Sequence, residues 1–425
     1  MIRLLHRLMS RHGVLMHYSG STALQKLTAM LASIAVLHWI QPADMGIWQA
    51  LILVQSYGEI LRLGITRGLN RELPFLLGQG RDAEAMQAAA TAQLHSLITG
   101  MFGSTVLLAG LLVPAWSSPH WRTALVAMAV TWFAGSYGNC LQATFRGHKE
   151  FQKLAYRQYF TSLLNVVSLA MVAWWGFSGM VWRTALIAVV NTLFLHQIRP
   201  FRLPLSWNWH AFRNLLSTGL PLYGSNCLMT VAQGFNSIIL LGLGGVELLG
   251  LYAPVSAILS VMDTIPQSFT AYANPRLVYG LGQNEQVRPV WRGAVRVSLA
   301  AVGVTIPIAL VGWLLLPWAF THVFPHYAPA VTACSWALLA GLFWALGSLR
   351  VALVVTKAWS WLYVYACAFV FLKWIFPWYF ANRLPPLNGL MIGETAAAVC
   401  LLVVAVWVSF RATHAPTPSL HAGSS

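Results

Sequence analysis

Charge is what this sequence has least of. Only 8% of its 425 residues are charged and 10 are acidic, whereas 58% are hydrophobic. About a quarter of the residues are charged in an ordinary soluble domain, so the composition excludes one. The apolar stretches are about 20 residues long or more, which suits membrane-spanning helices and is too long for the strands of a membrane barrel. We therefore expect an all-α integral membrane protein.

Motifs that carry chemistry are missing as well. The five cysteines are scattered through apolar stretches without metal or redox spacing. We find no nucleophile–base arrangement, no phosphate loop and no cluster of metal ligands. The loops are short, so no extramembrane domain is left to host a reaction. We expect a protein that is not an enzyme and has no metal site or cofactor, apart from a coupling ion, H⁺ or Na⁺.

Hydropathy predicts about twelve transmembrane helices, six in each half of the chain. The predicted spans are 13–40, 45–69, 88–115, 121–144, 154–176, 178–197, 212–241, 247–273, 290–318, 328–354, 357–380 and 386–410. An even number of spans places both termini on one side of the membrane.

The basic residues indicate which side that is. Most Lys and Arg residues, Arg157 among them, fall on the side of the termini, and the other side carries only Arg122, Arg183, Lys373 and Arg383. The positive-inside rule then makes both termini cytoplasmic. The net charge of +16 reflects this topology and attraction to membrane lipids, and requires no nucleic-acid partner.

The two halves of the chain repeat each other. A shift of 204 positions without a gap places Gly20-Ser21 on Gly224-Ser225 and Ser33-Ile34 on Ser237-Ile238. The acid Glu59 falls on another acid, Asp263. The repeat predicts an amino-terminal six-helix lobe and a carboxy-terminal one that enclose a path between them. We expect these lobes at 1–197 and 212–410, a cytoplasmic linker at 198–211 and a disordered cytoplasmic tail at 411–425.

Polar residues recur at helical spacing in the first and seventh spans. In a membrane such a stripe marks a protected or water-filled face. The second span adds a basic residue, Arg62. The candidates for lining a substrate cavity are Lys26, Gln25, Thr22, Arg62, Asn226, Thr230, Gln233 and Asn236. Helix–helix packing is the competing interpretation for the small and hydroxyl residues, but it suits Lys26 less well because an ionisable group within the membrane is costly.

Three acids are candidates for ion or proton coupling: Asp263, Glu59 and Glu394. Glu59 lies three residues before Arg62 and can pair with it on one helix face. Asp263 has Pro266 at the corresponding position, so it must find a cation elsewhere, bind an ion or take up a proton. For Glu394 a structural role and a coupling role both stay open.

Four segments suggest a family. They are PADMGIW at 42–48, NRELP at 70–74, FRGHKEF at 145–151 and GLPL at 219–222. These segments resemble bacterial polysaccharide flippases, the O-antigen and capsule exporters. Those proteins belong to the same superfamily as the multidrug and toxic-compound extruders and the lipid II flippase. The resemblance covers nearly the whole chain, to about residue 410.

The resemblance implies a V-shaped pair of six-helix lobes that works by alternating access in the inner membrane of a bacterial cell. The implied substrate is an undecaprenyl-diphosphate-linked oligosaccharide, an O-antigen, capsule or exopolysaccharide unit. Its implied partners are membrane lipids, a polysaccharide polymerase and other assembly proteins. In related flippases a cation on the first helix lines the cavity, and Lys26 looks like its counterpart.

Two other functions remain open. A cation-coupled multidrug or small-molecule extruder of the same fold would carry a carboxylate in its first helix, where this chain has the cation Lys26. A polysaccharide polymerase or ligase would be an enzyme with a large external loop bearing Arg and His. The short external loops argue against that class.

Overall fold

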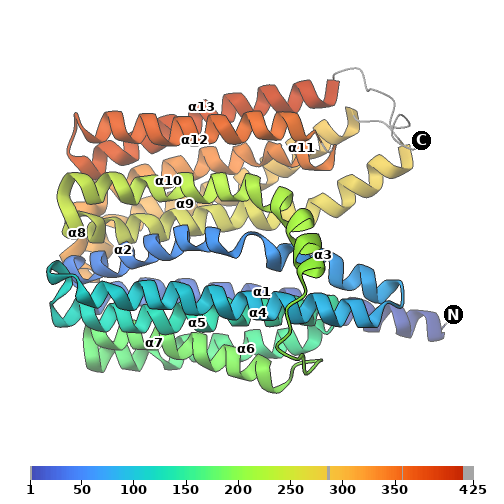
Figure 1. The fold of residues 1–425 in the computed structure, drawn as a ribbon. Helices are drawn as coiled ribbons and strands as arrows, with labels where there is room; N and C mark the ends of the chain where they lie inside the picture. The colour runs from blue at the N-terminus through green and yellow to red at the C-terminus, as the bar shows by residue number, and fades with distance from the viewer. Residues whose placement is uncertain (1, 285–287, 357, 415–425) are drawn as a thin grey trace. The chain divides into compact units, whose positions relative to one another are not determined.

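The computed structural model describes residues 2–284, 288–356 and 358–414. Regular secondary structure in these ranges is entirely helical, and nine of the helices are long and apolar enough to cross a membrane. The prediction of an all-α, multi-pass membrane protein is confirmed. The helices form two compact units, residues 1–227 and 228–425 (Figure 1).

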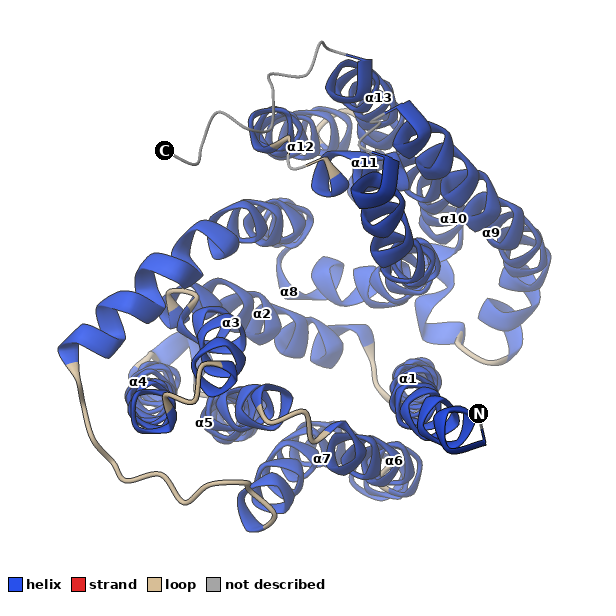
Figure 2. Cartoon of the chain, turned by 90° about the vertical axis from the view of Figure 1, so that its right-hand side faces the viewer, coloured by secondary structure: helices blue, strands red, loops and turns tan. Residues whose placement is uncertain are grey.

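The first unit is a helix bundle in which small residues pack α4 against α5. Its helices are α1 (Ile2–Trp39), α2 (Pro42–Gly58), α3 (Ile65–Gly78), α4 (Asp82–Ala109), α5 (Pro119–Gly147), α6 (Phe151–Val167) and α7 (Leu169–Gln197). Helix α1 packs on α6, and α5 packs on both α4 and α7 (Figure 2). Buried alanines such as Ala89 and Ala143 join α4 and α5 in one apolar cluster. Small side chains let membrane helices approach closely and gain packing contacts.

The second predicted span is not the continuous helix that we expected over 45–69. Helix α2 ends at Gly58 and is followed by a 3₁₀ turn, Glu59–Arg62. Leu63 (φ 48°) and Gly64 (φ 73°) then adopt left-handed conformations before α3 begins. Left-handed residues end a helix, and glycine takes this conformation without steric cost. The part of the predicted span that follows Gly64 therefore does not continue along the axis of α2.

Helix α8 (Trp209–Asn284) contains two predicted spans and turns back between them. Its backbone is non-helical at Gly245 (φ 66°, ψ −156°), between the predicted spans 212–241 and 247–273, and Figure 1 shows the reversal there. A similar kink at Gly176 in α7 separates the predicted fifth and sixth spans. Helix α8 contains two of the predicted spans but is one of the nine long helices. Helices α2 and α6 lie in two further predicted spans, but each has only 17 residues and is not among the nine. With these additions the nine long helices account for the twelve predicted spans.

The second unit consists of the rest of α8 and five further helices. They are α9 (Arg288–His322), α10 (Val331–Leu346), α11 (Val351–Val355), α12 (Trp359–Ala381) and α13 (Pro386–His414). Helix α13 packs along α12 and α10, and α9 packs on α10. Phe369 of α12 and Leu401 of α13 belong to one buried apolar cluster. Helix α13 therefore contributes side chains to the interior of this unit.

The predicted boundaries differ in detail from the structure. The division between the compact units lies at residue 227, inside α8, because the first part of α8 packs against α3: Leu215 joins Leu69 in one buried cluster. Helix α13 continues to His414, so the first four residues of the predicted disordered tail are helical. Residues 415–425 lie outside the described residues.

Candidate functional site

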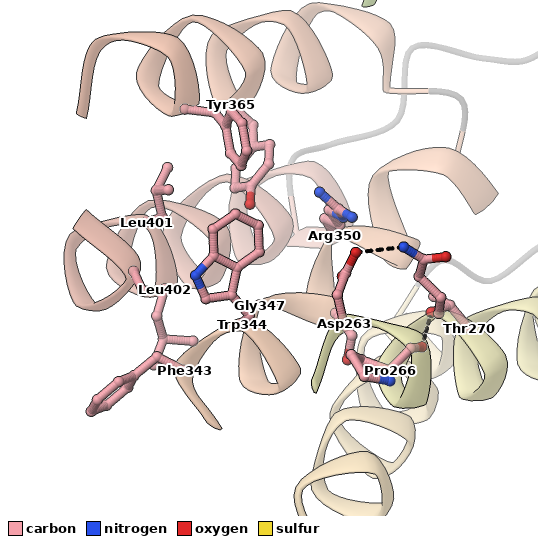
Figure 3. A pocket seen from close by; sticks show the side chains of 14 residues that line it. Asp263, Pro266, Thr270, Phe343, Trp344, Gly347, Arg350, Tyr365, Leu401 and Leu402 are labelled. Carbon is pink, nitrogen blue, oxygen red and sulfur yellow. Dashed lines mark hydrogen bonds between the residues drawn. The ribbon is translucent and has the colours of Figure 1, made fainter. Parts of the chain in front are cut away.

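A pocket in the second unit combines charged, amide and aromatic side chains. Its volume is about 480 Å³ including the open mouth. Four segments line it: α8, the end of α10 with the 3₁₀ turn that follows, α12 and α13. The lining residues are Asp263, Pro266, Gln267, Thr270, Phe343, Trp344, Gly347, Ser348, Arg350, Tyr365, Phe369, Ala398, Leu401 and Leu402 (Figure 3).

The polar side of the pocket is formed by α8 and Arg350. Gln267 Nε2 donates a hydrogen bond to Asp263 Oδ2 at 2.6 Å. Among the described residues Asp263 forms no ion pair, although Figure 3 shows Arg350 on the same side of the pocket. The guanidinium carbon of Arg350 lies 5.9 Å from the centre of the Tyr365 ring. A carboxylate, an amide and a guanidinium that line one cavity can bind hydroxyl groups and anionic oxygens.

The opposite side of the pocket is aromatic. Figure 3 shows the rings of Trp344 and Tyr365 across the cavity from Asp263. The Trp344 ring packs edge-to-face against Phe369, with 5.6 Å between ring centroids. Ligand pockets in proteins are mostly apolar and aromatic with a few placed polar groups, and this pocket has that composition.

A buried polar network lies on another side of Trp344. Lys373 Nζ lies 2.9 Å from Glu394 Oε1 and 4.6 Å from the centre of the Trp344 ring. Asn236 Nδ2 donates to Glu394 Oε2 at 3.0 Å and to the Tyr252 hydroxyl at 3.2 Å. Glu394, Asn236 and Lys373 are 0%, 1% and 4% exposed. The network joins α12 and α13 to α8 on both sides of the reversal at Gly245, because Asn236 precedes the reversal and Tyr252 follows it.

The predicted stripe on α1 divides into a packed part and an exposed part. Ser21 and Thr22 donate to Gln158 Oε1 of α6 at 2.6 and 3.0 Å. Thr22 therefore takes part in the helix–helix packing that was the competing interpretation. Gln25 is half-buried, whereas Lys26 is exposed and forms no ion pair with the described residues. Lys26 is thus a cation without a carboxylate partner among the described residues.

Arg62 and Glu59 form the ion pair that their spacing predicted. Arg62 Nη1 lies 2.7 Å from a Glu59 carboxylate oxygen. Arg62 also donates to Ser136 Oγ at 3.2 Å and lies over the Trp132 ring at 5.6 Å. The pair neutralises both charges within the membrane and holds the 3₁₀ turn against α5.

The predicted polar residues of α8 do not share one environment. The side chain of Asn226 lies outside the described residues. Thr230 and Gln233 are exposed, whereas Asn236 is buried beside Glu394. The sequence suggested different roles for Asn236 and Glu394, a substrate contact and a coupling group, but the fold brings the two side chains together.

Three cations that the prediction placed in loops are buried inside helices. They are Arg157 of α6, Arg183 of α7 and Lys373 of α12. Arg183 donates to Ser168 Oγ at 2.8 Å and to the Asn165 carbonyl at 2.9 Å, next to the end of α6. Each lies within the bounds of a predicted span, which was the signal that could have identified them. Within the predicted topology the excess of positive charge on the side of the termini stays a prediction, because the correction removes one cation from that side and two from the other.

Residues 36–326, more than half of the chain, match the model of a family described as polysaccharide biosynthesis protein. The chain belongs to the polysaccharide biosynthesis protein family. No curated protein sequence matches it.

Solved structures of several transporters share its fold. An inward-facing multidrug resistance MATE family transporter of the MOP superfamily superimposes with a TM-score of 0.67 at 16% identity, covering 92% of this chain and 94% of that one. The lipid II flippase MurJ in its inward closed conformation gives 0.69 at 9% identity, with 93% and 89% covered. A MOP superfamily transporter from Pyrococcus furiosus gives 0.59 at 16% identity, with 94% of each chain covered. This member of the polysaccharide biosynthesis protein family is a multi-pass membrane protein with the fold of MOP superfamily flippases and extruders.

Proposed function

We propose that this protein is a flippase for an undecaprenyl-diphosphate-linked oligosaccharide, an O-antigen, capsule or exopolysaccharide unit. It would move the substrate from the cytoplasmic to the outer leaflet of the bacterial inner membrane by alternating access, with both termini cytoplasmic. One observation carries the proposal: a chain of the polysaccharide biosynthesis family holds a pocket in which Arg350 and Gln267 face aromatic rings.

The substrate has two parts with different requirements. Carrying a charged diphosphate and hydroxyl-rich sugars through hydrocarbon without assistance costs on the order of tens of kcal/mol. A cation with several donors binds diphosphate oxygens, and Arg350 of the second unit and Lys26 of the first are suited to this role. Gln267 and Thr270 line the same pocket as Arg350 and can bond sugar hydroxyls, while the Trp344 ring offers an apolar surface to a sugar ring.

Coupling to an ion gradient is assigned to Asp263. Its carboxylate accepts one hydrogen bond from Gln267, and it forms no ion pair with the described residues. Such a carboxylate at the edge of a pocket can exchange a proton or Na⁺ with the solution. Glu59 is a weaker candidate because Arg62 already neutralises it.

A cation-coupled extruder of small molecules is the second candidate function. The aromatic rings and Asp263 of the pocket would suit an organic cation, and proteins of similar fold are multidrug transporters. Arg350 separates the two functions, because its charge attracts a diphosphate and repels a cation. The fold neighbours named above are flippases and extruders, so we propose a transporter and not a polymerase or ligase.

The test is transport in liposomes that contain the purified protein. Lipid-linked oligosaccharide is incorporated, and lectin accessibility from outside reports flipping. We expect wild-type protein to flip it and Arg350→Gln to lose about tenfold in rate, since hydrogen bonds to charged groups contribute roughly 1.5–3 kcal/mol. Arg383→Gln is the matched control, because Arg383 lies over Tyr379 as Arg350 lies over Tyr365, but outside the pocket. Uptake of tetraphenylphosphonium without oligosaccharide flipping would instead establish the extruder.

A further inference from the structure

The carboxylate of Glu394 lies in a cluster of buried oxygen atoms. Asn236 donates through its amide nitrogen to Glu394 and to Tyr252. The Asn236 carbonyl oxygen is buried and has no hydrogen-bond partner among the described residues. Carboxylate, amide carbonyl and hydroxyl oxygens are the ligands that hard cations such as Na⁺ and Ca²⁺ prefer. Glu394, Asn236 and Tyr252 therefore carry the oxygen types that bind a small cation.

The cation at this site belongs to the protein itself. Lys373 Nζ lies 2.9 Å from Glu394 Oε1, and both side chains are at most 4% exposed. The contact is a charge-assisted pair between the ammonium and the carboxylate. The ammonium also lies over the rings of Trp344 and Phe369 at 4.6 and 5.7 Å, where the ring faces attract a cation.

The Lys373–Glu394 pair is electrically neutral, so it offers no negative charge to a second cation. Glu394 forms one ion pair among the described residues, and it is with Lys373. Adding a further cation would place an uncompensated positive charge in a buried site, where charge interactions are weakly screened. Trp344 both lines the pocket that contains Asp263 and packs under the Lys373 ammonium. It therefore separates the ion pair from the pocket.

We propose that the ammonium of Lys373 permanently occupies a cation site between the carboxylate of Glu394 and the ring faces of Trp344 and Phe369, with Asn236 and Tyr252 bonded behind the carboxylate. The protein then carries at this position its own charge in place of a Na⁺ ion taken from solution. Removing the ammonium while keeping the carboxylate opens the site to a dissolved monovalent cation. The proposal does not depend on the transported substrate. It makes Glu394 a fixed partner of Lys373, which excludes the coupling role that its position in the last span left open.

The test is the thermal stability of detergent-solubilised variants in NaCl and in choline chloride at equal ionic strength. Any difference in melting midpoint between the two salts should be the same in the wild-type protein and in Glu394→Gln, because the native site takes up no Na⁺. Lys373→Met should melt at a lower temperature in choline chloride and regain stability as Na⁺ is added, with a constant rise per tenfold increase above the dissociation constant. Trp344 fluorescence should follow the same titration, because the ammonium lies over its ring.

Two controls isolate the site. The double variant Lys373→Met, Glu394→Gln should show no larger difference between the two salts than the wild-type protein, because the carboxylate is gone. Lys153→Met removes the lysine of a partly exposed Lys–Glu pair, in which Lys153 Nζ lies 2.7 Å from Glu150. It should not respond to Na⁺, since water solvates the remaining carboxylate. If Lys373→Met does not survive extraction, recovery of monodisperse protein after extraction in each salt replaces the melting curve.

Two results would overturn the proposal. The first is stabilisation of the wild-type protein by Na⁺ that disappears in Glu394→Gln, which would mean that the native site exchanges ions. The second is a Lys373→Met variant that behaves identically in NaCl and choline chloride, which would mean that the oxygen cluster does not bind a cation.

Discussion

The hydroxyl group of Tyr223 donates a hydrogen bond to the backbone carbonyl oxygen of Glu59 at 2.9 Å. The contact connects the first part of α8 to the break between α2 and α3. Carbonyl groups at a helix end lack intrahelical donors, and here a side chain from a distant segment provides one. The guanidinium of Arg67 lies over the same tyrosine ring at 5.3 Å. Tyr223 therefore stabilises the break in the second span from two directions.

Replacing Tyr223 with phenylalanine should destabilise the first unit. The ring remains for Arg67, but the carbonyl of Glu59 loses its donor, which costs about 1 kcal/mol. The melting midpoint in detergent should fall measurably. Tyr363→Phe, at an exposed tyrosine of α12, serves as the control and should leave the midpoint unchanged. Equal shifts in both variants would show that the hydrogen bond contributes nothing specific.

The close approach of α3 to α8 gives a second prediction. A methyl group on Gly68 would overlap the backbone carbonyl of Leu215, whereas one on Gly224 would meet open space. Gly68→Ala should therefore separate the two helices and cost about 1–3 kcal/mol. Gly224→Ala should be neutral or stabilising by up to about 1 kcal/mol, because alanine is the better helix former. Size-exclusion profiles after heating measure the difference; a stable Gly68→Ala protein would contradict the contact.

The exposed cation of α1 gives a third prediction. If Lys26 binds the diphosphate, Lys26→Ala should abolish export while the protein stays in the membrane. Lys26→Arg should keep much of the activity, because it retains the charge although its geometry differs. Lys153→Ala, at a partly exposed ion pair of α6, is the control and should export normally. Full export by Lys26→Ala would remove Lys26 from the substrate path.

Local spacing in the sequence predicted some of these relationships. Glu59 and Arg62 lie three residues apart, and the ion pair forms although the helix that carries them is broken. The break itself depends on left-handed backbone at Leu63 and Gly64. Hydropathy does not report this conformation, and leucine seldom adopts it.

The Lys373–Glu394 pair could not be predicted in this way. The two residues lie on different helices, α12 and α13, and their meeting depends on how those helices pack. Lys373 is surrounded in sequence by aromatic residues, including Trp374, a composition that is also typical of a membrane interface. Its position well inside α12 was the only local indication of burial.

Asp263 gives the last prediction, on energy coupling. Its carboxylate accepts a hydrogen bond from Gln267 at 2.6 Å and has no ion-pair partner among the described residues. Asparagine has nearly the same shape and keeps an acceptor oxygen, so Asp263→Asn should fold and melt as the wild-type protein does. If Asp263 exchanges a proton or Na⁺ during transport, flipping in liposomes should no longer respond to imposed H⁺ or Na⁺ gradients.

The homologous acid provides the matched control for this experiment. Glu59 is already paired with Arg62 at 2.7 Å, so Glu59→Gln leaves a partly buried guanidinium without its carboxylate. That variant should lose thermal stability, whereas its remaining activity should keep the gradient dependence of the wild-type protein. The two acids occupy equivalent positions in the repeat, but their substitutions should have opposite effects. Glu59→Gln should lower stability and keep the gradient dependence, whereas Asp263→Asn should keep stability and lose the gradient dependence. A folded Asp263→Asn protein whose flipping still follows the gradient would leave Asp263 as a substrate contact and require a different coupling group.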